Sequence, residues 1–88
     1  GLGAHVVTSS GASIEWSTNL ASDSAVEYGT STALGKTSGT QSALVREHRV
    51  QLNSLSAGRT YYYRVISNDG RGLRKTSELR SFKTLPTR

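Results

Sequence analysis

Two runs of alternating residues that flank a turn-rich segment constrain the fold of this chain more than any other feature. Apolar and polar side chains alternate in residues 46–52, REHRVQL, and again further along, where Tyr61, Tyr63 and Val65 occupy every second position. A period of two predicts half-buried β-strands. The intervening residues 53–60 are mostly polar and include a glycine, so they predict a tight turn between the two strands.

Tyr61 follows this turn directly and stands six residues beyond Leu55. A tyrosine at this position is typical of a tyrosine corner, in which the phenolic hydroxyl bonds to the backbone a few residues upstream. The corner predicts a two-sheet antiparallel sandwich, and it carries no information about what the chain binds.

Short alternating runs recur along the chain between turn residues at intervals of about 8–12 residues, which indicates an all-β sandwich. No segment shows helical spacing of its apolar residues. We expect residues 18–23 to form a loop, residues 29–42 to be weakly ordered and residues 68–72 to form a hairpin turn. The expected strands are residues 4–8, 12–17 and 44–52 in one sheet, and residues 24–28, 31–36, 60–67 and 76–84 in the other. The expected core is Ile14, Trp16, Val26, Tyr28, Val50, Leu52, Leu55, Tyr61, Tyr63, Val65 and Phe82.

The corner resembles that of fibronectin type III domains, through the spacing Leu52-x-x-Leu55-x-x-Gly58-x-x-Tyr61-x-Tyr63-x-Val65. Three further segments carry the same resemblance: Ile14-Glu15-Trp16, Val26-Glu27-Tyr28-Gly29 and Ser81-Phe82-Lys83-Thr84. Together they cover nearly the whole chain and are similar to the variety found in bacterial secreted proteins and at the front of purple acid phosphatases. The resemblance implies an immunoglobulin-like antiparallel β-sandwich of about seven strands. The chain departs from the family at Ala57, where proline is usual, and in its short first strand.

The chain has 88 residues, which suffice for one domain and not for two. We therefore treat residues 1–88 as a single domain and expect it to be a module cut from a longer chain. The absence of cysteine excludes disulfides and cysteine metal ligands. No apolar run approaches the roughly 20 residues of a membrane span, and no signal peptide is evident.

Lysine and arginine outnumber the acidic residues, and the formal net charge is +5. Such an excess attracts acidic partners over a long range, for example an acidic extracellular polymer. The charges are scattered along the chain and form no block of like sign. A simple contribution to solubility is therefore the alternative, and nucleic acid is not an expected partner.

Nothing in the sequence predicts catalysis, a cofactor or a metal centre. His5 and His48 lack any metal-ligand spacing, and we expect His5 to be exposed and His48 to be packed and bonded to a neighbouring loop. Glu15 and Glu27 should face outward from different sheets, too far apart to act on one bond. Glu27 instead lies opposite Arg64 in the expected sheet, where the two can form a cross-strand ion pair.

The remaining candidate is a binding face on the outer side of the second sheet. An aromatic ring beside basic groups can stack on a sugar while attracting an anion. The alternatives are a packing face for the next domain and an ordinary exposed surface. The candidate binding residues are Tyr62, Arg64, Ile66, Arg71, Arg74 and Lys75.

These observations favour a non-catalytic accessory module of a secreted or cell-surface multidomain protein. In that setting the sandwich acts as a spacer, a positioning element or a docking surface for neighbouring domains. Two alternatives stay open: a module that binds carbohydrate or another extracellular polymer, and an N-terminal domain packed on a phosphatase-like hydrolase. The fold alone cannot decide among them.

Overall fold

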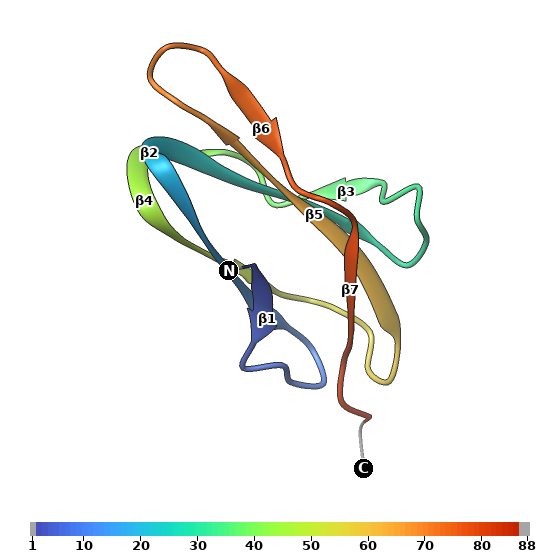
Figure 1. Cartoon of the computed structure of the whole chain (residues 1–88). Coiled ribbons are helices and arrows are strands. Elements are labelled where there is room, and N and C mark those ends of the chain that lie inside the picture. Colours follow the sequence, from blue (N-terminus) through green and yellow to red (C-terminus); the bar gives the residue numbers. More distant parts are fainter. Residues whose placement is uncertain (1, 87–88) are drawn as a thin grey trace.

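The computed structural model describes residues 2–86, which form seven β-strands and no helix (Figure 1). The expected all-β fold is therefore confirmed. None of the described residues forms a helix that could cross a membrane. The strands are β1 (Gly3–His5), β2 (Ala12–Gly29), β3 (Lys36–Thr37), β4 (Gln41–Leu52), β5 (Thr60–Asn68), β6 (Arg74–Thr76) and β7 (Arg80–Lys83).

The long strand β2 belongs to both layers of the sandwich. Its first part pairs with β1 and β4, and its second part pairs with β3 and β5. Strands β6 and β7 both pair with β5, on the edge of β5 away from β2. All pairings are antiparallel, so two facing sheets are joined through one continuous strand, with β1 and β4 in one sheet and β5 to β7 in the other (Figure 1).

The prediction of a loop over residues 18–23 is wrong, because β2 continues through this segment as an irregular strand. Its register with β4 shifts between Ser17 and Ser22, where β2 passes from one sheet to the other. The hydroxyls of Thr18 and Ser22 both donate to the carbonyl of Leu20, at 2.7 and 2.9 Å. Side-chain bonds of this kind replace the missing ladder bonds, and residue alternation does not reveal them.

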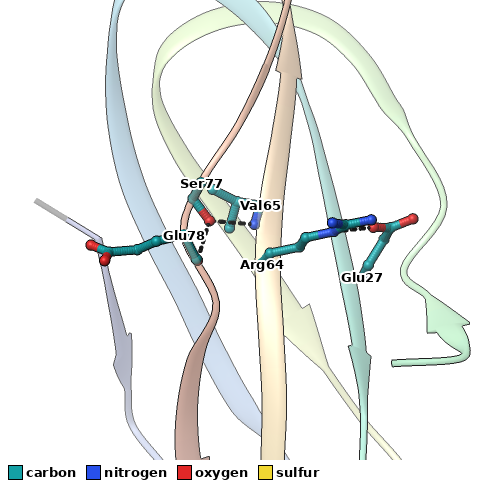
Figure 2. A network of polar contacts seen from close by, with 5 residues as sticks. All are labelled: Glu27, Arg64, Val65, Ser77 and Glu78. Atoms are coloured by element: carbon teal, nitrogen blue, oxygen red, sulfur yellow. Dashed lines mark hydrogen bonds and ion pairs between the residues drawn. The ribbon is translucent and has the colours of Figure 1, made fainter. Parts of the chain in front are cut away.

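The single last strand expected over residues 76–84 is divided into β6 and β7. Ser77 lies in the gap, where its N–H donates to the carbonyl of Val65 and its Oγ accepts from the Val65 N–H, both at 2.9 Å (Figure 2). Ser38 makes the same two contacts with Val26 at the other edge of the sheet, at 2.8 and 3.0 Å. Since Val26 and Val65 are register partners, a serine hydroxyl closes the ladder on either side of this central pair.

Two other short strands also differ in length from the expectation. Strand β1 is brief, as its sequence indicated. The strand expected over residues 31–36 is reduced to the two residues of β3, because residues 30–35 fold into a compact loop instead.

The core agrees closely with the expected set. Ten of its eleven members are buried in one cluster together with Ala12, and the eleventh, Tyr28, packs against that cluster while partly exposed. The indole of Trp16 is buried, and its Nε1–H donates to Ser67 Oγ at 3.0 Å. A buried indole keeps its polar atom satisfied in this way, as a well-packed core requires.

The tyrosine corner is confirmed. The hydroxyl of Tyr61 accepts a hydrogen bond from the backbone N–H of Ser56 at 2.8 Å. The buried hydroxyl of Thr84 donates to the carbonyl of the same serine at 2.7 Å and accepts from Arg59 N–H at 3.0 Å. Both backbone groups of Ser56 are therefore held by side chains from β5 and from the residue after β7, which ties the turn to the second sheet.

We expect Tyr61→Phe to destabilise the domain by about 1–3 kcal/mol, because the Ser56 N–H loses its acceptor while the ring stays packed. Urea unfolding followed by the fluorescence of Trp16 measures this change. Tyr62→Phe is the matched control, since no hydrogen bond involving the Tyr62 hydroxyl is found among residues 2–86, and its midpoint should stay within error of the wild type. Equal midpoints for both variants would show that the corner bond contributes nothing.

Candidate functional site

The structure separates the six candidate binding residues into different surroundings. Tyr62 and Arg64 lie on the outer face of the second sheet and are half-buried. Ile66 is only 7% exposed, so the expectation that it offers a contact surface is wrong. Its register partners are Ala25 of β2, which is also buried, and Thr76 of β6.

The basic residues of the β5–β6 hairpin do not join Tyr62 and Arg64 in one site. Arg74 pairs with Asn68 and Lys75 with Ser67, so their side chains point to opposite faces of the sheet. Asn68 is six residues beyond Tyr62 on β5, a separation of about 20 Å along a strand. The expected single basic and aromatic face is therefore two separate surfaces.

Lys75 borders a cleft of about 280 Å³ at the open side of the sandwich, between β2 and β6. Trp16, Leu20 and Leu73 line the same cleft, together with several hydroxyl groups and Asp69. Hydrogen bonds from the backbone N–H groups of Leu73 and Arg71 lower the pKa of Asp69. Asp69 therefore organises the hairpin tip as an ionised acceptor.

Glu27 and Arg64 form the expected cross-strand ion pair on the outer face of the second sheet. The two residues are register partners, and Arg64 Nε donates to Glu27 Oε1 at 2.5 Å (Figure 2). Their side chains are 30% and 42% exposed, so water reaches the pair from one side. A pair of this kind adds a modest ~0.2–1 kcal/mol to the sheet.

The ion pair forms one wall of a hollow of about 310 Å³. The opposite wall is the loop after β2 together with β3, which contribute residues 33–37. The loop is closed by a hydrogen bond from Leu34 N–H to the carbonyl of Ser31 at 3.0 Å, with Leu34 in the left-handed region at φ 67°. A Cβ at Gly29 would lie 1.7 Å from Leu34 O, so only glycine lets the loop fold over the end of β2.

Sequence reasoning missed the contribution of this loop, because residues 29–42 look weakly ordered. Thr37 lies opposite Glu27 in the register and so belongs to the outer face. The one available signal was the pair of glycines, Gly29 and Gly35, that flanks the loop; Gly35 adopts φ 96°. Two glycines indicate a turn, and they do not show which neighbouring strand it faces.

His48 is buried between the sheets, as expected, and holds the crossing segment of β2. Its ring stacks on the indole of Trp16 with centroids 4.8 Å apart and planes 3° from parallel. Its Nδ1 lies 2.6 Å from Ser24 Oγ, and its Nε2 lies 2.9 Å from Thr18 Oγ1. Since the single Thr18 hydroxyl proton is donated to Leu20, the contact requires His48 to donate from Nε2 and accept at Nδ1.

The neutral form of His48 fits this arrangement. Burial lowers the pKa of His48, because desolvation disfavours the imidazolium, although the carboxylates of Glu47 and Asp23 act in the opposite direction. Protonation of Nδ1 would also place a donor against the Ser24 hydroxyl that now donates to it. His5 is exposed, as expected.

Acid should therefore weaken the fold through His48. The pKa of His48 in the folded domain lies below the unfolded value of about 6.5, so the unfolded chain binds more protons. The free energy of unfolding therefore has its full value above about pH 6.5 and falls as the pH drops below it. Urea unfolding between about pH 7.5 and 5 measures the slope. His48→Gln should flatten the slope; identical slopes for wild type and His48→Gln would contradict this account.

No group of three or more His, Cys, Asp or Glu side chains within residues 2–86 is placed to hold a metal ion. Glu15 and Glu27 lie on different sheets, and Glu15 pairs with Arg49 of β4 at 3.1 Å. Both carboxylates thus serve in ion pairs on the outer faces.

Comparison with known proteins agrees with this architecture. The family model of the purple acid phosphatase N-terminal domain matches residues 4–84, nearly the whole chain. The chain belongs to this family. A search of curated proteins gives no significant match.

Solved structures that resemble this purple acid phosphatase N-terminal domain include a β-sandwich protein and fibronectin type III domains. The sensor domain of the anti-sigma factor RsgI4 of Pseudobacteroides cellulosolvens has a TM-score of 0.72 at 18% identity, over 98% of this chain and 92% of that one. A computationally redesigned β-sandwich protein has a TM-score of 0.71 at 15% identity, over 100% and 94% of the two chains. The sixth domain of human fibronectin type III domain containing protein 3 has a TM-score of 0.67 at 19% identity, over 99% and 83%. At these identities the likeness concerns the fold, and the expected fibronectin type III topology is confirmed.

Proposed function

We propose that this domain is a non-catalytic accessory module that positions neighbouring domains of a secreted or cell-surface protein. Membership of a family named for the N-terminal part of phosphatases supports a role beside a larger catalytic unit. The hydroxyl and imidazole groups that could have served chemistry are instead engaged in holding the fold, as His48, Thr18 and Ser24 illustrate.

The observation that carries this proposal is the distribution of exposed aliphatic side chains. The domain is elongated, 46 × 24 × 20 Å, and its large exposed aliphatic residues gather toward the two ends of the sandwich. Leu79, in the link between β6 and β7, is the exception. Val6 and Leu85 lie at one end, and Leu20, Leu44, Val45 and Leu73 lie at the other.

Contacts between separate segments place these residues together. At one end, Leu85 N–H donates to the carbonyl of Thr8 at 3.1 Å, so the turn that carries Val6 lies beside Leu85. At the other end, Leu44 approaches Gly70 of the hairpin, where a Cβ would lie 3.4 Å from its methyl group. Val6 is 77% exposed and has φ 48°, an uncommon conformation for a β-branched residue. Exposed apolar groups of this kind mark surfaces that other domains cover.

A second candidate function is binding of carbohydrate or another extracellular polymer. The observation that favours it is the placement of Tyr62 and Arg64 on one face beside the hollow. Packing of the domain on a phosphatase-like hydrolase is one form of the positioning role, in which the aliphatic ends are the contact surfaces.

The positioning role predicts that the aliphatic ends become inaccessible in the longer protein. The chain contains no cysteine, so single substitutions such as Val6→Cys and Leu73→Cys provide unique labelling sites. Maleimide labelling of at least one of them should be about tenfold or more slower in the longer protein than in the isolated domain, because a neighbouring domain buries it.

The control is Gln51→Cys, an exposed position on the first sheet, which should label at the same rate in both settings. Equal rates at both ends in the isolated domain and in the longer protein would contradict the positioning role.

A further inference from the structure

We propose that the hollow beside Glu27 and Arg64 is a binding site for one uncharged sugar residue of a polysaccharide. In this site the ion pair recognises two adjacent hydroxyl groups, and the ring of Tyr62 packs against a face of the sugar. The inference rests on the second candidate function, polymer binding, and is independent of the positioning role.

The ion pair has hydrogen-bonding capacity left over. Within residues 2–86, the side-chain bond from Arg64 Nε to Glu27 Oε1 is the only one that either group makes. The two guanidinium Nη groups and the second carboxylate oxygen therefore offer donors and an acceptor side by side. A sugar hydroxyl both donates and accepts, so two neighbouring hydroxyls match this arrangement, whereas a single carboxylate matches only the donors.

The carboxylate of Glu27 disfavours an acidic ligand at the ion pair. Glu27 and Arg64 balance each other, so an anion that approaches the free Nη groups of Arg64 meets the adjacent negative charge of Glu27. Lys36 also borders the hollow, but its register partner is Tyr28, on the inner face of the sheet. The basic hairpin lies at the far end of β5 and serves a different surface.

Tyr62 does not line the hollow itself but stands beside it, two residues before Arg64 on the same face of β5, about 7 Å along the strand. Its register partner is Gly29, and the backbone of Leu34 fills the space where a Cβ of Gly29 would stand, so the loop and the half-buried tyrosine border the same part of the sheet. An aromatic face next to planar polar groups provides both contact area and orientation for a ring-shaped ligand.

The site is built before any ligand arrives. Leu34 is fixed by its bond to Ser31, and the Thr37 hydroxyl accepts from Gly39 N–H at 3.2 Å, which leaves its own proton to donate. A closed loop and a formed ion pair lower the entropy that binding must otherwise remove.

The other sheet offers a matched comparison. Glu15 and Arg49 form an equivalent ion pair at 3.1 Å on its outer face, and Glu15 is 31% exposed, nearly as Glu27 is. That pair borders a depression of about 510 Å³ in which Trp16 and His48 are buried and the exposed ring is the imidazole of His5. It has the ion pair of the proposed site without a tyrosine ring beside it.

The test is an amide NMR titration of the domain with two probes, cellopentaose as the neutral oligosaccharide and oligogalacturonate as the acidic one, at low and high salt. We expect cellopentaose to shift the resonances of Tyr62, Arg64 and residues 33–37 with an affinity that salt does not change. Tyr62→Ala and Glu27→Gln should each weaken binding by about tenfold, because they remove the stacking face and the charged acceptor respectively. Glu15→Gln is the control and should bind as the wild type does.

Two results would overturn the proposal. One is the absence of shifts with cellopentaose while the variants remain folded by Trp16 fluorescence. The other is binding of oligogalacturonate alone, with shifts at Arg71, Arg74 and Lys75 that vanish at high salt, which would assign ligand attraction to the hairpin charge. Neither result bears on the labelling of the aliphatic ends, so the positioning role is judged separately.

Discussion

His48 bonds to both sides of the place where β2 leaves the first sheet and enters the second. Thr18 precedes the crossing and Ser24 follows it, and one imidazole contacts both hydroxyls while it stacks on Trp16. A strand that changes sheets loses part of its ladder, and these side-chain bonds tie the two parts of β2 to β4 while satisfying the polar atoms of His48, which would be costly if left unpaired in the core. The relative position of the two sheets depends on this neutral histidine.

The position of the second sheet depends on where β2 crosses. Beyond Ser24, β2 pairs directly with β5, and Ser38 and Ser77 close the ladder on either side of Val26 and Val65. The ladder is thus fixed at its centre, next to the residues whose side chains face outward. A site on a paired strand is held more rigidly than one on a loop, so the outer face suits recognition while the strand ends suit contacts with other domains.

The core and the corner could be predicted from the sequence because both depend on residues close together along the chain. Alternation gave the inward positions, and the spacing from Leu55 to Tyr61 gave the corner bond. The irregular crossing of β2 and the covered Ile66 could not be predicted, since each depends on which distant strands lie alongside. The loop of residues 30–35 beside Glu27 could not be predicted for the same reason. Its composition suggests disorder, and its closure depends on a glycine at the end of β2.

The proposed sugar site requires that the Glu27–Arg64 ion pair is already formed in the free domain. NMR relaxation of the arginine Nε–H groups tests this requirement, because it reports the mobility of each guanidinium. Arg64, 42% exposed and bonded to Glu27, should show a slowly exchanging Nε–H with a high order parameter, while Arg49, 74% exposed, should be more mobile. Equal, extensive motion of both side chains would contradict the claim, since the hollow would then have no fixed wall.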